Sequence, residues 1–140
     1  VSRSYVERLG APAHPRELQN TDHCIVGFLS SRTSKIDPLV LCSENERIEI
    51  TGNYVLAVDD GNAYLEAGLV GLGVIALPNY MAAAHQAVGA LIPLFTQWRI
   101  SPMPLYLAFP PNRHVNAKLR VFIDWIVEVM LQHVPITNNK

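Results

Sequence analysis

The stretch LEAGLVGLGVIALPNYM, residues 65–81, contains three glycines, at positions 68, 71 and 73. In a dinucleotide-binding loop such glycines follow a strand and open a helix, because the free N–H groups of that helix hold the pyrophosphate. Here the preceding residues, 59–69, predict a helix of about three turns that Asp59 and Asp60 can cap. The glycines therefore follow a helix, and this order argues against a phosphate-binding loop.

The glycines instead predict a turn that leads from a helix into a strand. Gly71 suits the left-handed position just past a helix end, where a residue without Cβ is not strained. Gly73 precedes the apolar run 74–77, which is typical of a buried strand covered on both faces. Pro78 is tolerated in the first turn of a helix, which predicts a helix over 79–88.

Strands and helices alternate along the rest of the chain, which predicts an α/β fold with ligands bound beyond the carboxyl ends of the strands. Predicted strands cover residues 24–29, 38–42, 47–50, 54–58, 91–95 and 103–109. The second and third form an antiparallel pair, and 91–95 is an edge strand because Pro93 cannot donate to a ladder. Predicted helices comprise a short one ending at Gly10, one turn over 16–18, and a long one over 115–133.

The helix over 115–133 has the clearest pattern in the chain. Its apolar residues recur at helical spacing, while its charged residues lie mostly off the stripe. The stripe consists of Leu119, Phe122, Ile123, Ile126 and Met130. An apolar helix face needs a partner surface, so we expect this helix to pack on another part of a longer protein or on another chain.

Composition indicates a globular protein and narrows its class. The 140 residues are 49% hydrophobic and 16% charged, with a net charge of −1. The eleven basic residues are spread along the chain, so this segment offers no electrostatic footprint for nucleic acid. No apolar stretch is long enough to cross a bilayer, and the first residues do not resemble a signal peptide. Cys24 and Cys42 are predicted to be free, buried thiols, which favours a cytoplasmic location.

The sequence offers no catalytic, metal-binding or cofactor-binding constellation. Asp59 and Asp60 are adjacent and are better explained as helix caps than as a catalytic pair. The histidines show no metal-ligand spacing, and Ser30-Ser31 lies in a polar loop without the glycines of a nucleophile elbow. We therefore expect binding without turnover, no metal and no cofactor.

Further motifs, taken in order, resemble the later part of the effector-binding domain of LysR-type transcriptional regulators. No single motif is decisive, but their order and spacing are specific. They are Ser2-Arg3-Ser4-Tyr5-Val6, Gly10-Ala11-Pro12, Leu18, His23-Cys24-Ile25, Val58-Asp59-Asp60, Ala67 to Val74, Leu77-Pro78, Gly89-Ala90-Leu91, Trp98, Pro104-Leu105-Tyr106, Pro110 to His114 and Phe122-Ile123-Asp124-Trp125. Ser31-Arg32-Thr33 and the ending from Arg113 are most similar to the CrgA-like branch.

This resemblance implies an α/β, periplasmic-binding-protein-like (type 2) lobe with a mixed sheet flanked by helices. Residues 1–102 would form the second lobe, and residues 103–140 a crossing strand and a C-terminal helix that return to the absent first lobe. A small-molecule effector would bind between the lobes. Promoter DNA would be bound by an N-terminal winged helix-turn-helix of the parent protein, which would assemble as a homo-oligomer, a dimer or tetramer, and would not bind a membrane. The chain would thus be a fragment.

The resemblance also implies which residues face the cleft between the lobes. They are the helix start at Ser2, the strand end formed by Gly27, Phe28, Leu29, Ser30 and Ser31, and the helix start at Asp59 and Asp60. Helix N-termini offer unpaired N–H groups to a carboxylate-bearing effector, although Asp59 disfavours a strongly anionic ligand directly against it. Two alternatives remain open from the sequence: a solute-binding protein of the same fold, and a small α/β enzyme.

Overall fold

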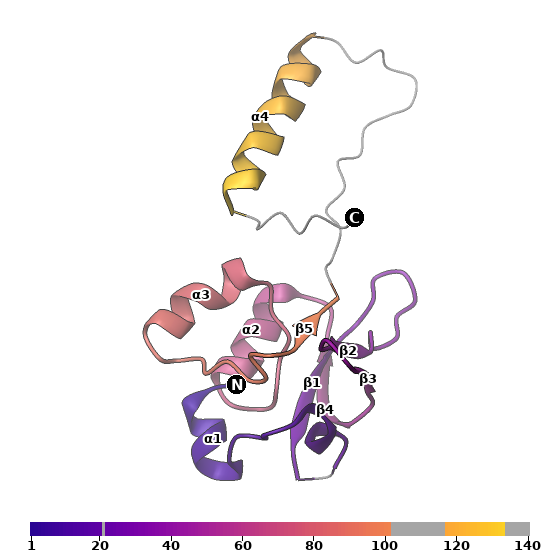
Figure 1. The fold of residues 1–140 in the computed structure, drawn as a ribbon, viewed down its shortest axis with the longest axis vertical. Helices are drawn as coiled ribbons and strands as arrows, with labels where there is room; N and C mark the ends of the chain where they lie inside the picture. Colours follow the sequence, from indigo (N-terminus) through magenta and orange to yellow (C-terminus); the bar gives the residue numbers. More distant parts are fainter. Residues whose placement is uncertain (21, 102–116, 134–140) are drawn as a thin grey trace. The chain divides into compact units, whose positions relative to one another are not determined.

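The computed structural model describes residues 1–20, 22–101 and 117–133, which belong to two units, Val1–Pro102 and Met103–Lys140. The first unit contains three α-helices, one 3-10 helix and five strands (Figure 1). In chain order these are α1 (Arg3–Leu9), η1 (Pro15–Gln19), β1 (Cys24–Phe28), β2 (Leu39–Cys42), β3 (Arg47–Ile50), β4 (Asn53–Val58), α2 (Gly61–Leu69), α3 (Asn79–Ala87) and β5 (Arg99–Ile100). The second unit contains α4 (Ala117–His133).

Strand β1 lies at the centre of a parallel arrangement. On one side it pairs with β4, so that Phe28 lies opposite Val58, and on the other side Ile25 forms a parallel bridge with Val74. A separate antiparallel sheet has the order β3-β2-β5. Helix α2 packs on β1 and β4 (Figure 1). The expected α/β architecture is therefore present, with parallel and antiparallel strands in two sheets.

The two faces of β1 are buried in different hydrophobic clusters. Ile25 belongs to the larger one, which also contains Tyr5 and Leu18, while Val26 packs with Tyr64 of α2. Both side chains are almost fully buried. Because successive side chains of a strand point to opposite faces, a strand covered on both faces must be apolar throughout. This explains the uninterrupted apolar run of residues 24–29.

The helix, glycine turn and following helix of the opening stretch are confirmed. Helix α2 ends at Leu69, and Gly71 follows it with φ of 81°, the left-handed conformation that favours glycine. Helix α3 begins directly after Pro78, which is its N-cap residue. The antiparallel pair β2–β3 and strands β1 and β4 are also confirmed, within one or two residues at their ends.

Two predicted strands are wrong, and the reasons are local. In 74–77 only Val74 reaches the ladder of β1, because the N–H of Ala76 donates to the Tyr64 hydroxyl at 3.0 Å instead. In 91–95 only Leu91 forms a bridge, with Ser2, before Pro93 interrupts pairing and Phe95 adopts φ of 52°. Strand β5, with two residues, was not predicted. The predicted strand 103–109 lies outside the described residues.

Helix α4 is described by itself. It begins at Ala117, so residues 115 and 116 of the predicted helix lie outside the described residues. Phe122 and Trp125 place their rings 5.8 Å apart, and the Trp125 side chain is 55% exposed within the described structure. The expectation that the apolar stripe packs on another part of a longer protein or on another chain remains a prediction.

Candidate functional site

The carboxyl ends of β1 and β4 lie side by side at one end of the parallel sheet. The register pairs Phe28 with Val58, and the N–H of Leu29 donates to the Val58 carbonyl at 2.7 Å. The next residues, Ser30 on one strand and Asp59 on the other, therefore leave the sheet together. The structure thus brings seven of the eight sequence-predicted site residues to one sheet end: Gly27, Phe28, Leu29, Ser30, Ser31, Asp59 and Asp60.

The loop after β1 is closed by its own backbone hydrogen bonds. The Ser30 N–H donates to the Lys35 carbonyl at 2.9 Å, and the Ser34 N–H donates to the Ser30 carbonyl at 2.8 Å. Leu29 forms an antiparallel bridge with Ile36. Ser31 at the tip is exposed. The backbone donors of Leu29 and Ser30 are thus used within the chain, whereas the Ser31 side chain faces solvent.

The two adjacent aspartates have different environments. Asp60 caps α2: its Oδ1 accepts the N–H groups of Asn62 at 2.9 Å and Ala63 at 2.8 Å. Both carboxylates are exposed, and Asp59 is not part of this cap. Capping, the sequence-based explanation, is confirmed for Asp60. Since two of the first N–H groups of α2 are taken by the chain's own carboxylate, they are not free for a ligand carboxylate.

Ser2, the eighth predicted site residue, is engaged elsewhere. It is 3% exposed and caps α1, where its Oγ accepts the Tyr5 N–H at 3.2 Å and lies 3.0 Å from the Ser4 Oγ. It also forms an antiparallel bridge with Leu91. None of these contacts involves the residues at the strand ends. Helix α1 also has only seven residues, so it offers a short dipole.

Aromatic packing supports the seven residues at the ends of β1 and β4 (Gly27 to Ser31, Asp59 and Asp60), which we call the strand-end group. The rings of Phe28 and Tyr64 meet edge to face with centroids 5.4 Å apart, and Tyr64 anchors residues 74–77 through Ala76. Burial raises the pKa of the Tyr64 hydroxyl above its ordinary value, and the Ala76 N–H lowers it by a smaller amount. Tyr64 is therefore a neutral structural group at physiological pH.

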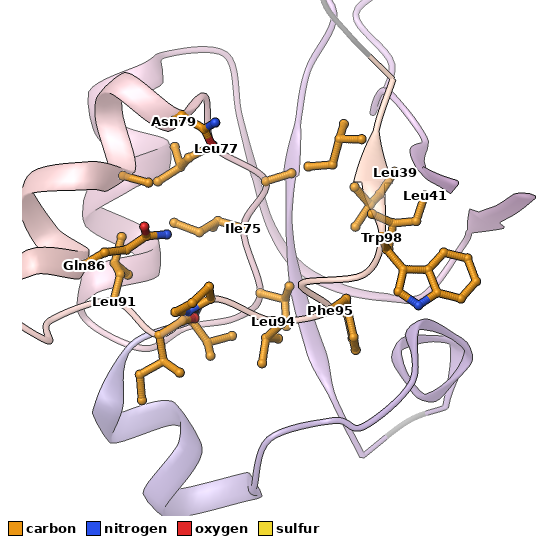
Figure 2. Close-up of a pocket in the computed structure, with 17 residues that line it drawn as sticks. Leu39, Leu41, Ile75, Leu77, Asn79, Gln86, Leu91, Leu94, Phe95 and Trp98 are labelled. Atoms are coloured by element: carbon orange, nitrogen blue, oxygen red, sulfur yellow. The ribbon is translucent and has the colours of Figure 1, made fainter. Parts of the chain in front are cut away.

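The sequence did not reveal a cavity of about 210 Å³ that lies between α3 and strands β2 and β5 (Figure 2). None of the eight predicted site residues lines it. The signal was the cluster of apolar residues in 91–95, which the sequence analysis assigned to an edge strand, together with Trp98. Leu91, Leu94, Phe95 and Trp98 from this segment line the cavity.

The described residues contain no group of three or more potential metal ligands. Cys24 and Cys42 are free, as predicted, but half-buried rather than fully buried. Within the same part of the chain, no helix is long and apolar enough to cross a membrane. The geometry therefore offers a strand-end group with exposed hydroxyl and carboxylate groups, and a separate apolar cavity.

Comparison with known proteins identifies the family. The family model described as the LysR substrate binding domain matches residues 1–131. An uncharacterized HTH-type transcriptional regulator of Escherichia coli K12, YhjC, is 29% identical over 134 residues, which are 96% of this chain and 44% of that protein. The chain therefore spans less than half the length of this curated relative.

Solved structures share the fold. The full-length Vibrio cholerae virulence activator AphB, a member of the LTTR family, has a TM-score of 0.73 at 21% identity, covering 92% of this chain and 43% of AphB. The regulatory domain of AphB from Vibrio vulnificus has a TM-score of 0.69 at 22% identity, covering 91% of this chain and 62% of that one. The fold is thus the periplasmic-binding-protein-like (type 2) α/β fold expected from the sequence. The resemblance to the CrgA-like branch stays a prediction, but the chain belongs to the LysR substrate-binding domain family.

Proposed function

We propose that this chain is the effector-sensing part of a LysR-type transcriptional regulator that works in the cytoplasm. The observation that carries the proposal is the family match over residues 1–131. Residues 1–102 would be the second lobe of the effector-binding domain, and residues 103–140 the crossing strand and C-terminal helix that return to the first lobe. A small metabolite would bind between the lobes without being turned over.

The strand-end group is the proposed contribution of this chain to the effector site. In open α/β sheets, ligands bind beyond the carboxyl ends of parallel strands, where Ser30, Ser31 and Asp59 lie together. Asp60 occupies two N–H groups of α2 and adds a negative charge. We therefore propose an effector that presents a hydrogen-bond donor toward this side, such as a hydroxyl, amide or amine group.

Regulation would follow from differential binding. An effector that binds one arrangement of the lobes more tightly than another shifts the population toward that arrangement. In the parent protein, that shift would alter the geometry of a homo-oligomer on promoter DNA, which is held by an N-terminal winged helix-turn-helix. The coupling between effector and DNA would be reciprocal, so DNA would change effector affinity by the same factor.

The test uses the full-length parent protein. A thermal-shift screen of small hydroxylated, aminated and aromatic metabolites should yield at least one compound that raises Tm, and that compound should change DNA affinity in fluorescence anisotropy. Ser31→Trp should abolish the Tm shift, because the bulky indole would block the space beside the strand-end group where the effector is proposed to bind. Thr51→Trp is the matched control: Thr51 is also exposed, but it precedes β4 and lies at the opposite end of that strand. Conversion of the compound by the protein, or equal shifts in both variants, would contradict the proposal.

A further inference from the structure

We propose that the cavity beside α3 is a binding site for a small, neutral, mostly apolar molecule with one hydrogen-bonding group. This site lies within the unit Val1–Pro102 and involves none of the strand-end residues, so the inference does not depend on the proposed function. It adds a second ligand to the lobe, bound independently of the effector between the lobes.

Most of the side chains that line the cavity are apolar, and they come from several elements. They include Leu39 of β2, Ile75 and Leu77 of the segment after the glycine turn, and Leu94, Phe95 and Trp98 (Figure 2). No charged side chain is among the described residues that line it. Val1 also lines the cavity, but its α-ammonium already donates to the Ile92 carbonyl at 3.1 Å, and burial lowers its pKa. Burying an ion here would cost its hydration with little compensation, so a neutral ligand is favoured.

The volume sets the size of the ligand. The cavity measures about 210 Å³ and is partly open to solvent, and a dry apolar protein cavity of roughly 150 Å³ accommodates benzene. A single six-membered ring with one small substituent therefore fits inside it.

Two carboxamides give the cavity its polar contacts. Asn79 and Gln86, at the start and near the end of α3, both line it, and Figure 2 shows the Gln86 amide directed toward Ile75. Both residues are exposed, and neither side chain has a hydrogen bond to another residue within the part of the chain that the structure describes. A carboxamide can donate and accept, so a ligand amide or hydroxyl would be complementary.

The backbone at Phe95 is a second, independent observation. Phe95 has φ of 52°, a conformation that a bulky residue rarely adopts, and its carbonyl accepts the Trp98 N–H at 2.7 Å. Such backbone strain concentrates at ligand-binding sites, where the surroundings maintain it. Here the strained turn holds both the Phe95 and the Trp98 side chains in the cavity wall.

Trp98 provides the experimental signal. The chain contains two tryptophans, Trp98 and Trp125, so Trp125→Phe leaves Trp98 as the sole reporter. Titration of this 140-residue variant with benzamide and with benzyl alcohol should change Trp98 emission saturably, with Kd on the order of 1 mM or tighter. Benzoate should bind at least about tenfold more weakly because it is charged.

Ala82→Leu fills the cavity from α3 and should weaken benzamide binding about tenfold or more. Ala83→Leu is the matched control: Ala83 is the next residue of the same helix, exposed and outside the cavity, and its substitution should change nothing. Ala82 is buried, so a larger side chain there can also destabilise the fold. Gln86 is exposed, and Gln86→Ala therefore tests the polar contact separately. Gln86→Ala should weaken benzamide binding about fivefold, whereas Gln97→Ala should not.

The outcomes separate this site from the proposed effector site. In the same reporter chain, Ser31→Leu, which adds no tryptophan, should leave benzamide binding unchanged, since Ser31 does not line the cavity. Absence of a saturable signal with both probes, or wild-type affinity in both Ala82→Leu and Gln86→Ala, would overturn the inference. Neither result would bear on whether an effector binds at the strand ends.

Discussion

Gly68 lies directly beneath the side chain of Ile75: a Cβ at position 68 would be 2.0 Å from Cδ1 of Ile75 and 2.7 Å from its Cγ1. This contact brings α2 close to the segment that follows the glycine turn. Gly73 has a similar role on β1, because a Cβ there would lie 2.8 Å from the Cys24 carbonyl oxygen. The glycines thus permit close packing of helix on sheet.

The first prediction concerns this contact. Gly68→Ala should lower the free energy of unfolding by about 1–3 kcal/mol, because Ile75 must leave its position. Gly61→Ala in the same helix is the matched control, since its Cβ would meet only the Met81 methyl at 3.7 Å. We expect that control to be neutral or stabilising by up to about 1 kcal/mol. Urea unfolding measures both, and equal effects would contradict the packing argument.

The second prediction separates backbone strain from crowding. Gly10 and Gly71 have nearly the same φ, 78° and 81°, but a Cβ at Gly10 meets nothing within 4 Å. At Gly71 a Cβ would lie 2.7 Å from the Ser4 Oγ and 2.9 Å from the Ser2 Oγ. Gly10→Ala should therefore cost about 1–3 kcal/mol from the backbone alone, because φ of 78° with ψ of 168° is a conformation essentially restricted to glycine. Gly71→Ala should cost at least about 2 kcal/mol, from the backbone and from the contacts with the two serines, and a smaller loss in urea unfolding would refute this.

The third prediction distinguishes the adjacent aspartates. Asp60→Ala removes the acceptor for two N–H groups of α2 and should lower the free energy of unfolding by about 0.5–2 kcal/mol. Asp59→Ala, at an exposed residue outside the cap, should change it by less than about 0.5 kcal/mol. Denaturant titration of the two variants side by side checks the difference, which vanishes if Asp60 is not the cap in solution.

The fourth prediction concerns alkaline stability. Burial raises the pKa values of Tyr5, Tyr54 and Tyr64 above 10.0 in the folded chain. The unfolded chain therefore ionises first, so stability is full below about pH 10 and is lost as the pH rises through the folded pKa values. Tyr64→Phe should flatten this loss, while costing roughly 1 kcal/mol at neutral pH through the unpaired Ala76 N–H.

The measurement for this variant is the urea midpoint as a function of pH from neutrality to beyond the tyrosine range. Tyr80→Phe is the matched control, because the Tyr80 side chain is 80% exposed. A Tyr64→Phe profile parallel to that of the control would show that Tyr64 does not contribute to the alkaline loss.

Local patterns in the sequence predicted the features that depend on residues close together in the chain, such as helix caps, the glycine turn and the apolar strand. The Asp60 cap and the left-handed Gly71 follow from hydrogen-bonding capacity and from the missing Cβ, and the apolar run of β1 follows from burial on both faces. The position of the glycines after a helix likewise argued against a phosphate-binding loop. The residues of the strand-end group were implied by the resemblance to LysR-type effector-binding domains, whereas the parallel pairing of β1 with β4 that brings them together comes from the fold.

Contacts between distant residues decided the rest. The N–H of Ala76 donates to Tyr64, twelve residues earlier, so 74–77 stops pairing after Val74. Ser2 bridges to Leu91, which places it with the α1 cap and apart from the strand ends. The cavity exists because β2, α3 and the strained turn at Phe95 converge on one space. Residue spacing specifies which side a side chain faces, whereas only the folded chain specifies which distant group it meets there.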